Sequence, residues 1–591
     1  MSSTGALLAL LAWAAAASTM AAAAGAASVA APTDGAAPAD GAPVATARLL
    51  LRGGRVHAAD GSVAEAVAVD ARGVVIAVGR AADLERLRAA DTRVVELAGR
   101  AVLPGLDDQH VHPLFAGLRQ RECVIPQGSS RTALQERLRA CVAAAPRGAW
   151  ITGGQWDAPA LGGVPDKSLL DAVAPDNPVV LDDTSGHSSV ANTRALAAAG
   201  ITRATPDPAG GIIEHDAGGR PTGVLREDAA INLVKSRVPP PSAEAVRAAL
   251  QWSLQEMLAQ GITSYTEAAV GFPAGSDKEL AAYTALADGG VLKQRVRLCL
   301  TWEAGNEATE ALIAHRNFYA RERIAPDCVK IFLDGVPTDS HTAAMVEPYG
   351  SRMPGRDDAA SRSGLLLVKQ DVLDAAVTRF DRMGLTVKYH AAGDAAVRAG
   401  LDAIEAARRA NGFSGHLHDV GHCTFVTRAD VARARGIAAT FEVSPYLWGP
   451  SPINDSIAAA VGDARMERVW PVRDMLDAGA PVVAGSDWAV VPSVNPWIAI
   501  EQLVTRERVG GSADAFGRAE AITLPEAIAL FTVNAARHLG REGSLGGIAP
   551  GMLADLIVLD QDPYAVPIRE VHRTRVQLTV IGGEVVYERR D

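Results

Sequence analysis

Two histidines, His110 and His112, stand at the end of an apolar stretch with one residue between them. Side chains of a β-strand alternate between its two faces, so both imidazoles point the same way. Neutral imidazole is a common zinc ligand, and two on one face can share one metal. Pro113 follows at once and ends the strand. Taken alone, the pair fits either a metal site or ordinary surface or hydrogen-bonded histidines.

Four further residues that could complete such a site lie at the ends of later apolar stretches. They are Lys330, His390, His422 and Asp487. Imidazole and carboxylate groups are what a site for one or two divalent ions requires. His418 shares a strand face with His422, so either could be the ligand of that strand.

The elements that must position these residues form a repeating pattern of apolar strand, loop and helix. We expect eight such strands, at residues 101–112, 261–266, 295–301, 327–334, 385–390, 418–422, 437–442 and 481–487. Eight units of this kind predict the α/β class and a closed parallel (β/α)8 barrel. Active sites of such barrels lie at the carboxyl ends of the strands, where the candidate ligands fall.

Two departures from this pattern predict further parts of the chain. Residues 113–255, between the first two strands, exceed what a crossover helix requires, so we expect an insertion that covers the site as a lid. Residues 48–103 and 541–591 contain short alternating stretches separated by glycine-rich turns, which predict β-strands. We expect both ends to build one small β-sandwich around a barrel formed by residues 104–540.

With these residues in this order, the chain resembles the amidohydrolase superfamily, and most closely its amidohydrolase family 3 (YtcJ-like) branch, which includes N-substituted formamide deformylases. The resemblance covers nearly the whole chain after Arg48. It rests on the order of several segments: Val102-Leu103-Pro104-Gly105 running into His110 and His112; Gly186-His187-Ser188 with Asn192; residues 221–227; residues 329–335; His390 with Gly393-Asp394; His422; Gly485-Ser486-Asp487; and residues 543–559.

The resemblance implies a role for each candidate ligand. His110 and His112 would bind the more buried metal, and His390 and His422 the second. Asp487 would bind the buried metal and carry the proton of the attacking water. The implied cofactor is a divalent metal, Zn in one or two copies.

Lys330 would bridge the two metals in this family. An ammonium with a pKa of about 10.4 cannot ligate a metal, so the bridge requires a carbamate formed from the amine and CO₂. The alternative is a mononuclear enzyme with unmodified Lys330 paired to Asp334, which shares its strand face. In that case Glu227 could supply a carboxylate in place of the carbamate of Lys330.

Glu227, Asp334 and Trp156 are candidates for the substrate pocket, and His187 of the expected insertion is a candidate catalytic residue. His187 could donate a hydrogen bond to a substrate carbonyl, or be a structural loop histidine. Trp156 follows Gly153 and Gly154 and could form a pocket wall, although an aromatic beside glycine also fits plain packing.

The implied activity is hydrolysis of a non-peptide C–N bond, of the amide or formamide type, in a small molecule through a metal-activated hydroxide. The same site could instead hydrolyse cyclic amides, esters or amines, the last as a deaminase. A non-catalytic exported binding protein is a third hypothesis. It predicts a damaged ligand set, and the ligand set is intact.

Composition and charge limit the classes of binding partner that we expect. The net charge of -11, with no basic run, argues against nucleic acid and favours a small-molecule ligand. No segment reaches the roughly 20 apolar residues of a membrane span, so no integral membrane domain is expected. The family implies a homodimer, for which the sequence shows no heptad run.

The N-terminus predicts export. Residues 1–27 contain an apolar run and Ala-Xaa-Ala cleavage options, which are typical of a signal peptide for a periplasmic or secreted protein. They lack the basic residues that usually begin such a signal, so a membrane tether or a cytoplasmic location is the alternative. Residues 28–47 are rich in Ala, Pro and Gly and predict a linker.

The five cysteines have no CxxC spacing, so neither a zinc ribbon nor a disulfide framework is evident. An odd number leaves at least one free thiol in an exported protein.

Overall fold

The computed structural model describes residues 46–590, except residues 121, 273, 354–357 and 447. The expected export signal, residues 1–27, and nearly all of the expected linker, residues 28–47, lie outside the described residues. None of the described helices combines the length and apolar composition that crossing a membrane requires.

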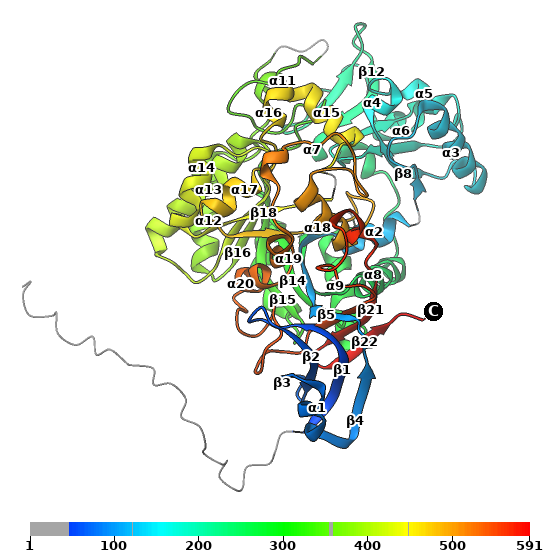
Figure 1. Cartoon of the computed structure of the whole chain (residues 1–591). Coiled ribbons are helices and arrows are strands. Elements are labelled where there is room, and N and C mark those ends of the chain that lie inside the picture. The colour runs from blue at the N-terminus through cyan, green and yellow to red at the C-terminus, as the bar shows by residue number, and fades with distance from the viewer. Residues whose placement is uncertain (1–45, 121, 273, 354–357, 447, 591) are drawn as a thin grey trace, which may run out of the picture. The chain divides into compact units, whose positions relative to one another are not determined.

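Eight parallel strands form the central sheet (Figure 1), which confirms the predicted barrel class. In spatial order they are β6 (Leu106–Val111), β13 (Ile262–Val270), β14 (Arg295–Thr301), β15 (Ile324–Phe332), β16 (Thr386–Ala391), β17 (His418–His422), β18 (Ala439–Val443) and β19 (Val482–Ala484). At the seam between the first and last strands, the Asp487 N–H donates to the His110 carbonyl oxygen over 2.6 Å. The Ser486 N–H donates to Oδ1 of Asp108 over 2.8 Å. These bonds hold the two ends of the sheet together.

Helices surround this sheet and bury one face each. They include α8 (Ala243–Ala259), α9 (Ser276–Asp288), α10 (Glu307–Ala314), α12 (Gln370–Arg382), α13 (Asp394–Asn411), α14 (Arg428–Ala434), α17 (Val472–Asp477), α18 (Pro496–Thr505), α19 (Leu524–Leu530) and α20 (Val533–His538). In α12, Leu373, Val377 and Phe380 recur at helical spacing and are buried against the core. Such apolar stripes fix how each helix faces the barrel.

The prediction of a single first strand over residues 101–112 is wrong, because this segment forms two strands. β5 (Ala101–Pro104) belongs to a different sheet from β6, and Gly105 separates them. A Cβ at Gly105 would lie 2.3 Å from Oγ1 of Thr263, so no larger residue fits at this turn. The apolar run continues through the turn because both sides of it are buried.

Both chain ends contribute to one eight-stranded sheet. Its strands are β1 (Ala47–His57), β2 (Val63–Val69), β3 (Val75–Gly79), β4 (Arg88–Glu96) and β5 from the beginning, and β20 (Leu556–Leu559), β21 (Val576–Ile581) and β22 (Glu584–Glu588) from the end. β5 pairs antiparallel with β20, and Val102 lies opposite Val558. This pairing brings residues from the two ends of the chain into one hydrophobic core.

The segment after β6 contains a six-stranded sheet in the order β11-β12-β10-β9-β8-β7. These strands are β7 (Cys123–Val124), β8 (Ile151–Trp156), β9 (Val179–Asp183), β10 (Ser188–Ala191), β11 (Ile212–His215) and β12 (Pro221–Arg226). Its helices are α3 (Arg131–Ala144), α4 (Ala158–Leu161), α5 (Lys167–Asp171), α6 (Thr193–Ala199) and α7 (Glu227–Lys235). The flanking helices α2 (Pro113–Arg119) and α8 pack closely, since a Cβ at Gly117 would lie 2.1 Å from the Ala249 carbonyl oxygen. α8 also contacts β13, so the ends of residues 113–255 pack with the barrel.

Two disulfides correct the expectation that no disulfide framework is evident. Cys123 pairs with Cys141, which links β7 to α3, and Cys299 pairs with Cys328, which links β14 to β15. Cys299 and Cys328 are register partners in the parallel sheet, a proximity that their spacing along the chain does not reveal. Cys423 is free and buried.

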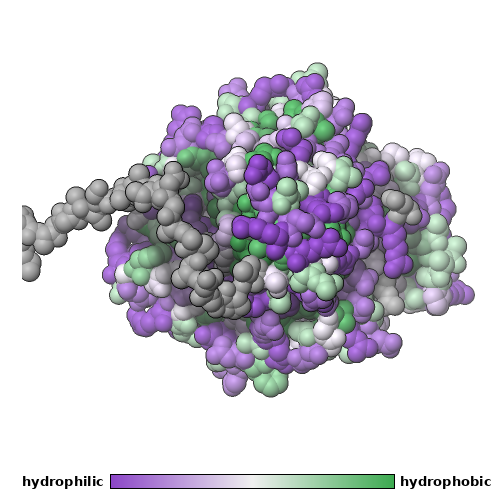
Figure 2. Space-filling model, turned by 60° about the horizontal axis from the view of Figure 1, so that its bottom comes forward, coloured by the Kyte–Doolittle hydropathy of each residue, from purple (hydrophilic) through white to green (hydrophobic). Residues whose placement is uncertain are grey.

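Figure 2 shows one face of the molecule, on which hydrophilic residues predominate among the described residues.

Candidate active site

All six candidate ligands line one cavity of about 170 Å³ at the carboxyl ends of the barrel strands. They come from β6 or its end (His110, His112), β15 (Lys330), β16 (His390), β17 (His422) and the segment after β19 (Asp487). His187, from the six-stranded insertion sheet, lines the same cavity. The structure therefore brings together every predicted ligand.

The Asp487 carboxylate lies among three imidazoles. Its Oδ1 is 3.4 Å from Nε2 of His112 and 3.8 Å from Nε2 of His110. Its Oδ2 is 3.9 Å from Nδ1 of His422. The two histidines expected to share a strand face do present their Nε2 atoms to one carboxylate.

A second carboxylate lies behind each of these two histidines. Nδ1 of His110 is 2.6 Å from Oε2 of Glu442 on β18, and Nδ1 of His112 is 3.3 Å from Oε1 of Glu267 on β13. Both glutamates are buried. Sequence reasoning missed them because each belongs to a strand that carries no candidate ligand, and their proximity depends on strand order.

The electrostatics of the two histidines differ. Burial lowers the pKa of His110 well below its usual value, and the positive charge of Lys330 adds to this effect. Burial acts the same way on His112, but hydrogen bonds with Asp487 and Glu267 outweigh it and raise its pKa to about 9. The carboxylates around His112 thus stabilise positive charge at this point of the cavity.

His390 and His422 lie side by side, with ring centroids 4.4 Å apart, and the His422 ring is 4.7 Å from that of His110. Burial lowers the pKa of both residues well below the usual value, which favours neutral imidazole. His418 points elsewhere, because its Nε2 lies 2.9 Å from Oδ1 of Asp381. His422 is therefore the histidine of β17 that faces the cavity.

Lys330 lies within the cavity wall with its Nζ 4.9 Å from the centre of the Phe332 ring. Burial, followed by the charge of Lys388, lowers its pKa to about 8. Among the residues that the structure describes, no ion pair joins Lys330 to Asp334. Asp334 instead accepts backbone N–H groups of Ala344, Ala392 and Gly393, which explains why it does not serve as the partner of Lys330.

Glu227 contacts His187 rather than a candidate metal ligand. Its Oε2 lies 2.9 Å from Nδ1 of His187. Burial would lower the pKa of His187, but the charge of Glu227 outweighs it and raises this pKa to about 9. The other oxygen, Oε1, is buried without a hydrogen-bond partner among the described residues, and it lies 2.3 Å from where a Cβ at Gly335 would be.

The three pocket candidates, Glu227, Asp334 and Trp156, do not line the cavity, so their prediction as pocket residues is wrong. Trp156 shows the reason most clearly. Its side chain is buried in the core of the insertion, with Cys123 and Leu181 in the same cluster. Its indole N–H donates to the Leu181 carbonyl oxygen over 2.9 Å. The positive φ values of Gly153 and Gly154 shape β8 around this packing, and Trp156 serves the insertion.

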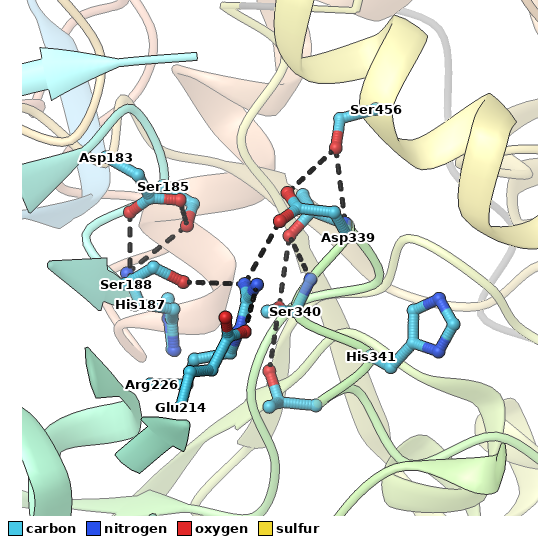
Figure 3. A network of polar contacts seen from close by, with 12 residues as sticks. Asp183, Ser185, His187, Ser188, Glu214, Arg226, Asp339, Ser340, His341 and Ser456 are labelled. Carbon is cyan, nitrogen blue, oxygen red and sulfur yellow. Dashed lines mark hydrogen bonds and ion pairs between the residues drawn. The ribbon is translucent and has the colours of Figure 1, made fainter. Parts of the chain in front are cut away.

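A polar network around the buried Arg226 links the loop that carries His187 to the barrel (Figure 3). Arg226 donates to Glu214 over 2.6 Å, to Ser188 over 3.2 Å and to Asp339 over 3.1 Å. Asp339 follows β15 and also accepts from Ser456 over 3.2 Å. The network ties β10 and β12 of the insertion to the segment after β15 and to helix α15 (Pro452–Val461), and so helps to place His187 over the site.

Several candidate residues have left-handed backbones. The φ values are 60° at Glu227, 70° at His422 and 58° at Asp487. Such conformations cost a non-glycine residue about 1 kcal/mol or more, and they cluster at functional sites in proteins. His422 and Asp487, at strand ends, line the cavity, whereas Glu227, at the start of α7, contacts His187 instead.

The remaining walls of the cavity are largely apolar. They include Phe115, Phe272, Phe332, Trp448, Ile457 and Trp470. The Trp448 and Trp470 rings stack with centroids 5.0 Å apart. A small molecule with an apolar portion fits walls of this kind.

The donor set fits a divalent metal. One ligand atom each from His110, His112 and Asp487 lies within 4.8 Å of the others, as do atoms of His110, His422 and Glu442. Imidazole nitrogens with carboxylate oxygens are the ligands that zinc takes in catalytic sites.

Comparison with known proteins defines the class. Residues 93–587 match the model of the amidohydrolase family, so the chain belongs to this family and is a hydrolase. It is 29% identical to YtcJ of Bacillus subtilis (strain 168), provisionally named an amidohydrolase, over 90% of this chain and 97% of that one. It is also 29% identical to N-substituted formamide deformylase of Arthrobacter pascens, over 89% and 96%. An uncharacterized metal-dependent hydrolase of Pyrococcus horikoshii OT3 has the same fold, with a TM-score of 0.66, 23% identity, and coverage of 88% of this chain and 99% of that one.

Proposed function

We propose that the protein hydrolyses a non-peptide C–N bond, of the amide or formamide type, in a small molecule with an apolar substituent. The observation that carries this proposal is the position of Asp487, whose carboxylate contacts the imidazoles of His110, His112 and His422 in one cavity. The apolar walls support the choice of substituent.

His110, His112 and Asp487 would hold one divalent metal, Zn in our proposal, and His390 and His422 a second. A metal held there supplies Lewis-acid chemistry, which polarises a carbonyl and lowers the pKa of water to about 7. Asp487 has two carboxylate oxygens and lines the cavity. With one oxygen on the metal, the other would accept the proton of the attacking water and deliver it to the leaving amine. Proton transfer of this kind accelerates a reaction by a factor of roughly 10² to 10⁴.

Lys330 is the proposed bridge between the metals, as a carbamate. Two observations support it: the amine faces the cavity, and no carboxylate of the described residues forms an ion pair with it. A carbamate would add one negative charge and two oxygens where two cations need them.

His187 is the proposed hydrogen-bond donor to the substrate carbonyl. Glu227 occupies Nδ1, which leaves Nε2 free to donate into the cavity. A donor aimed at the carbonyl oxygen stabilises the charge that develops there when water attacks.

The two disulfides support an oxidising compartment, and we propose that the protein is exported to the periplasm or secreted. A homodimer stays a prediction.

A substrate panel tests the proposed activity. The metal-loaded enzyme should release formate or amine from N-benzyl- and N-alkylformamides or the matching N-acyl amines. Cyclic amides, carboxylic esters and aminopurines of similar size form the comparison set. Preferential turnover of that comparison set would replace the amide proposal with one of the alternative reactions on the same ligands.

A further inference from the structure

We infer that Glu442 is a positioning residue that fixes the orientation of His110 for metal binding, an inference that rests on the proposed metal site. Glu442 lies on β18, a strand that carries no candidate ligand. Its Oε2 is 2.6 Å from Nδ1 of His110, and its side chain has no exposed surface. It does not line the active-site cavity.

The contact determines which nitrogen of His110 is available. An Nδ1–H that donates to Glu442 leaves the lone pair on Nε2, and Nε2 is the atom that faces Asp487 at 3.8 Å. The imidazole cannot rotate about its bond to Cβ without losing this hydrogen bond inside the barrel, where water cannot replace it.

Glu442 is itself held in place. Ser444 donates to its Oε1 over 3.2 Å, and Nζ of Lys388 lies 3.8 Å from its Oε2. Lys388 in turn pairs with Asp419 at 2.5 Å, and Asp419 lies 3.2 Å from Nε2 of His538 on α20. This buried chain extends from the metal site to a helix outside the barrel.

Glu442 could instead be a ligand, because one of its oxygens lies within 4.8 Å of ligand atoms of His110 and His422. Its contacts favour positioning. Oε2 contacts the histidine and Oε1 accepts from Ser444, so both oxygens already have partners.

The chain offers a matched control. Glu501 lies 2.6 Å from Nδ1 of His572 and is equally buried, in a carboxylate–imidazole pair that does not line the active-site cavity. Glu501→Gln therefore reproduces the loss of a buried charged partner of histidine without touching the proposed metal ligands.

The test measures Co²⁺ and Zn²⁺ binding to chelator-treated full-length protein by competition with a chelating dye, together with the visible spectrum of bound Co²⁺ and thermal unfolding. Glu442→Gln should keep the metal stoichiometry of the wild type, weaken affinity by about 10- to 100-fold and change the Co²⁺ spectrum. Glu442→Leu should weaken it further. Glu501→Gln should shift unfolding alone.

Three outcomes of the metal-binding test would overturn the inference. Wild-type affinity and spectrum in both Glu442 variants would exclude positioning, and loss of a metal equivalent would make Glu442 a ligand. A wild type that binds neither metal would overturn the proposed function as well, so the two failures are distinguishable. If the Glu442 variants do not fold, nitrogen NMR of the histidine-labelled, Zn-loaded wild type decides the question: His110 should be protonated at Nδ1 and metal-bound at Nε2, and the reverse assignment would contradict the inference.

Discussion

Nε2 of His112 lies 3.4 Å from Oδ1 of Asp487, so a residue before the insertion and a residue more than 370 positions later meet at one point of the barrel. The Asp487 N–H also donates to the His110 carbonyl oxygen across the seam between β19 and β6. The backbone contact that joins the two ends of the sheet therefore also positions the proposed proton carrier.

Asp487→Asn should retain most of the metal and lose turnover by roughly 10² to 10⁴, because the amide keeps one oxygen ligand but cannot accept the proton. Metal content and kcat of the same preparation check this. Asp371→Asn, on the exposed start of α12, serves as the control for folding. A variant with wild-type kcat would exclude the proposed role of Asp487.

His187→Ala should lower kcat/KM by about 10² to 10³, the usual cost of removing one donor to a developing oxyanion. Glu227→Gln should have a smaller effect, because the ring remains but its partner loses charge. The double variant should match His187→Ala alone, since Glu227 acts through the histidine. Fully additive losses in steady-state kinetics would show that Glu227 has a separate role.

Much of this site follows from sequence because its ligands end strands in a fixed order. His110, His112, His390 and His422 lie at or beside strand ends, Lys330 lies close to the end of β15, and a parallel barrel brings such ends together. Glu442 and Glu267 could not be found this way. Each is an acidic residue inside a buried strand, and its role depends on which strands are neighbours.

The wrong predictions have the same origin. Trp156 beside two glycines resembles a pocket wall in sequence, but the side of β8 that it occupies faces the core of the insertion. Cys299 and Cys328 form a pair only because β14 and β15 are adjacent and in register. Neither outcome is encoded by local spacing.

Asp381→Asn should destabilise the protein at neutral pH by about 3 kcal/mol, because it leaves buried donors without a charged acceptor. Asp381 accepts from Arg408 over 2.8 Å and from His418 over 2.9 Å. Burial would raise its pKa, but hydrogen bonds from His418, Ser414 and Asn411 outweigh it and hold the pKa of Asp381 well below its usual range.

The same shift predicts a pH dependence. A carboxyl with a depressed pKa in the folded state contributes its full stability above its unfolded pKa, about 3.9, and loses it as pH falls further. The difference in unfolding free energy between wild type and Asp381→Asn should therefore be constant from pH 7 to about 5 and shrink below about 4. Urea unfolding across this range measures it, and a difference that grows on acidification would contradict the assignment.

Thiol titration of the protein prepared under oxidising conditions should find one reactive thiol after unfolding without reductant, from Cys423, and five after reduction. Replacing Cys123 and Cys141 by serine should cost about 2 to 4 kcal/mol of stability, because the disulfide closes a loop of 18 residues in the unfolded chain. Peptide mapping by mass spectrometry identifies the pairs. Five thiols without reduction would contradict both disulfides.

The most direct test of the central claim is metal content, measured by elemental mass spectrometry on protein purified without chelator from zinc-supplemented medium, beside Lys330→Ala. We expect close to two metals per wild-type chain, fewer in Lys330→Ala, and a mass increase of one CO₂ on Lys330 under mild ionisation. One metal in both proteins would contradict the carbamate bridge, and no metal in the wild type would contradict the proposed hydrolytic site.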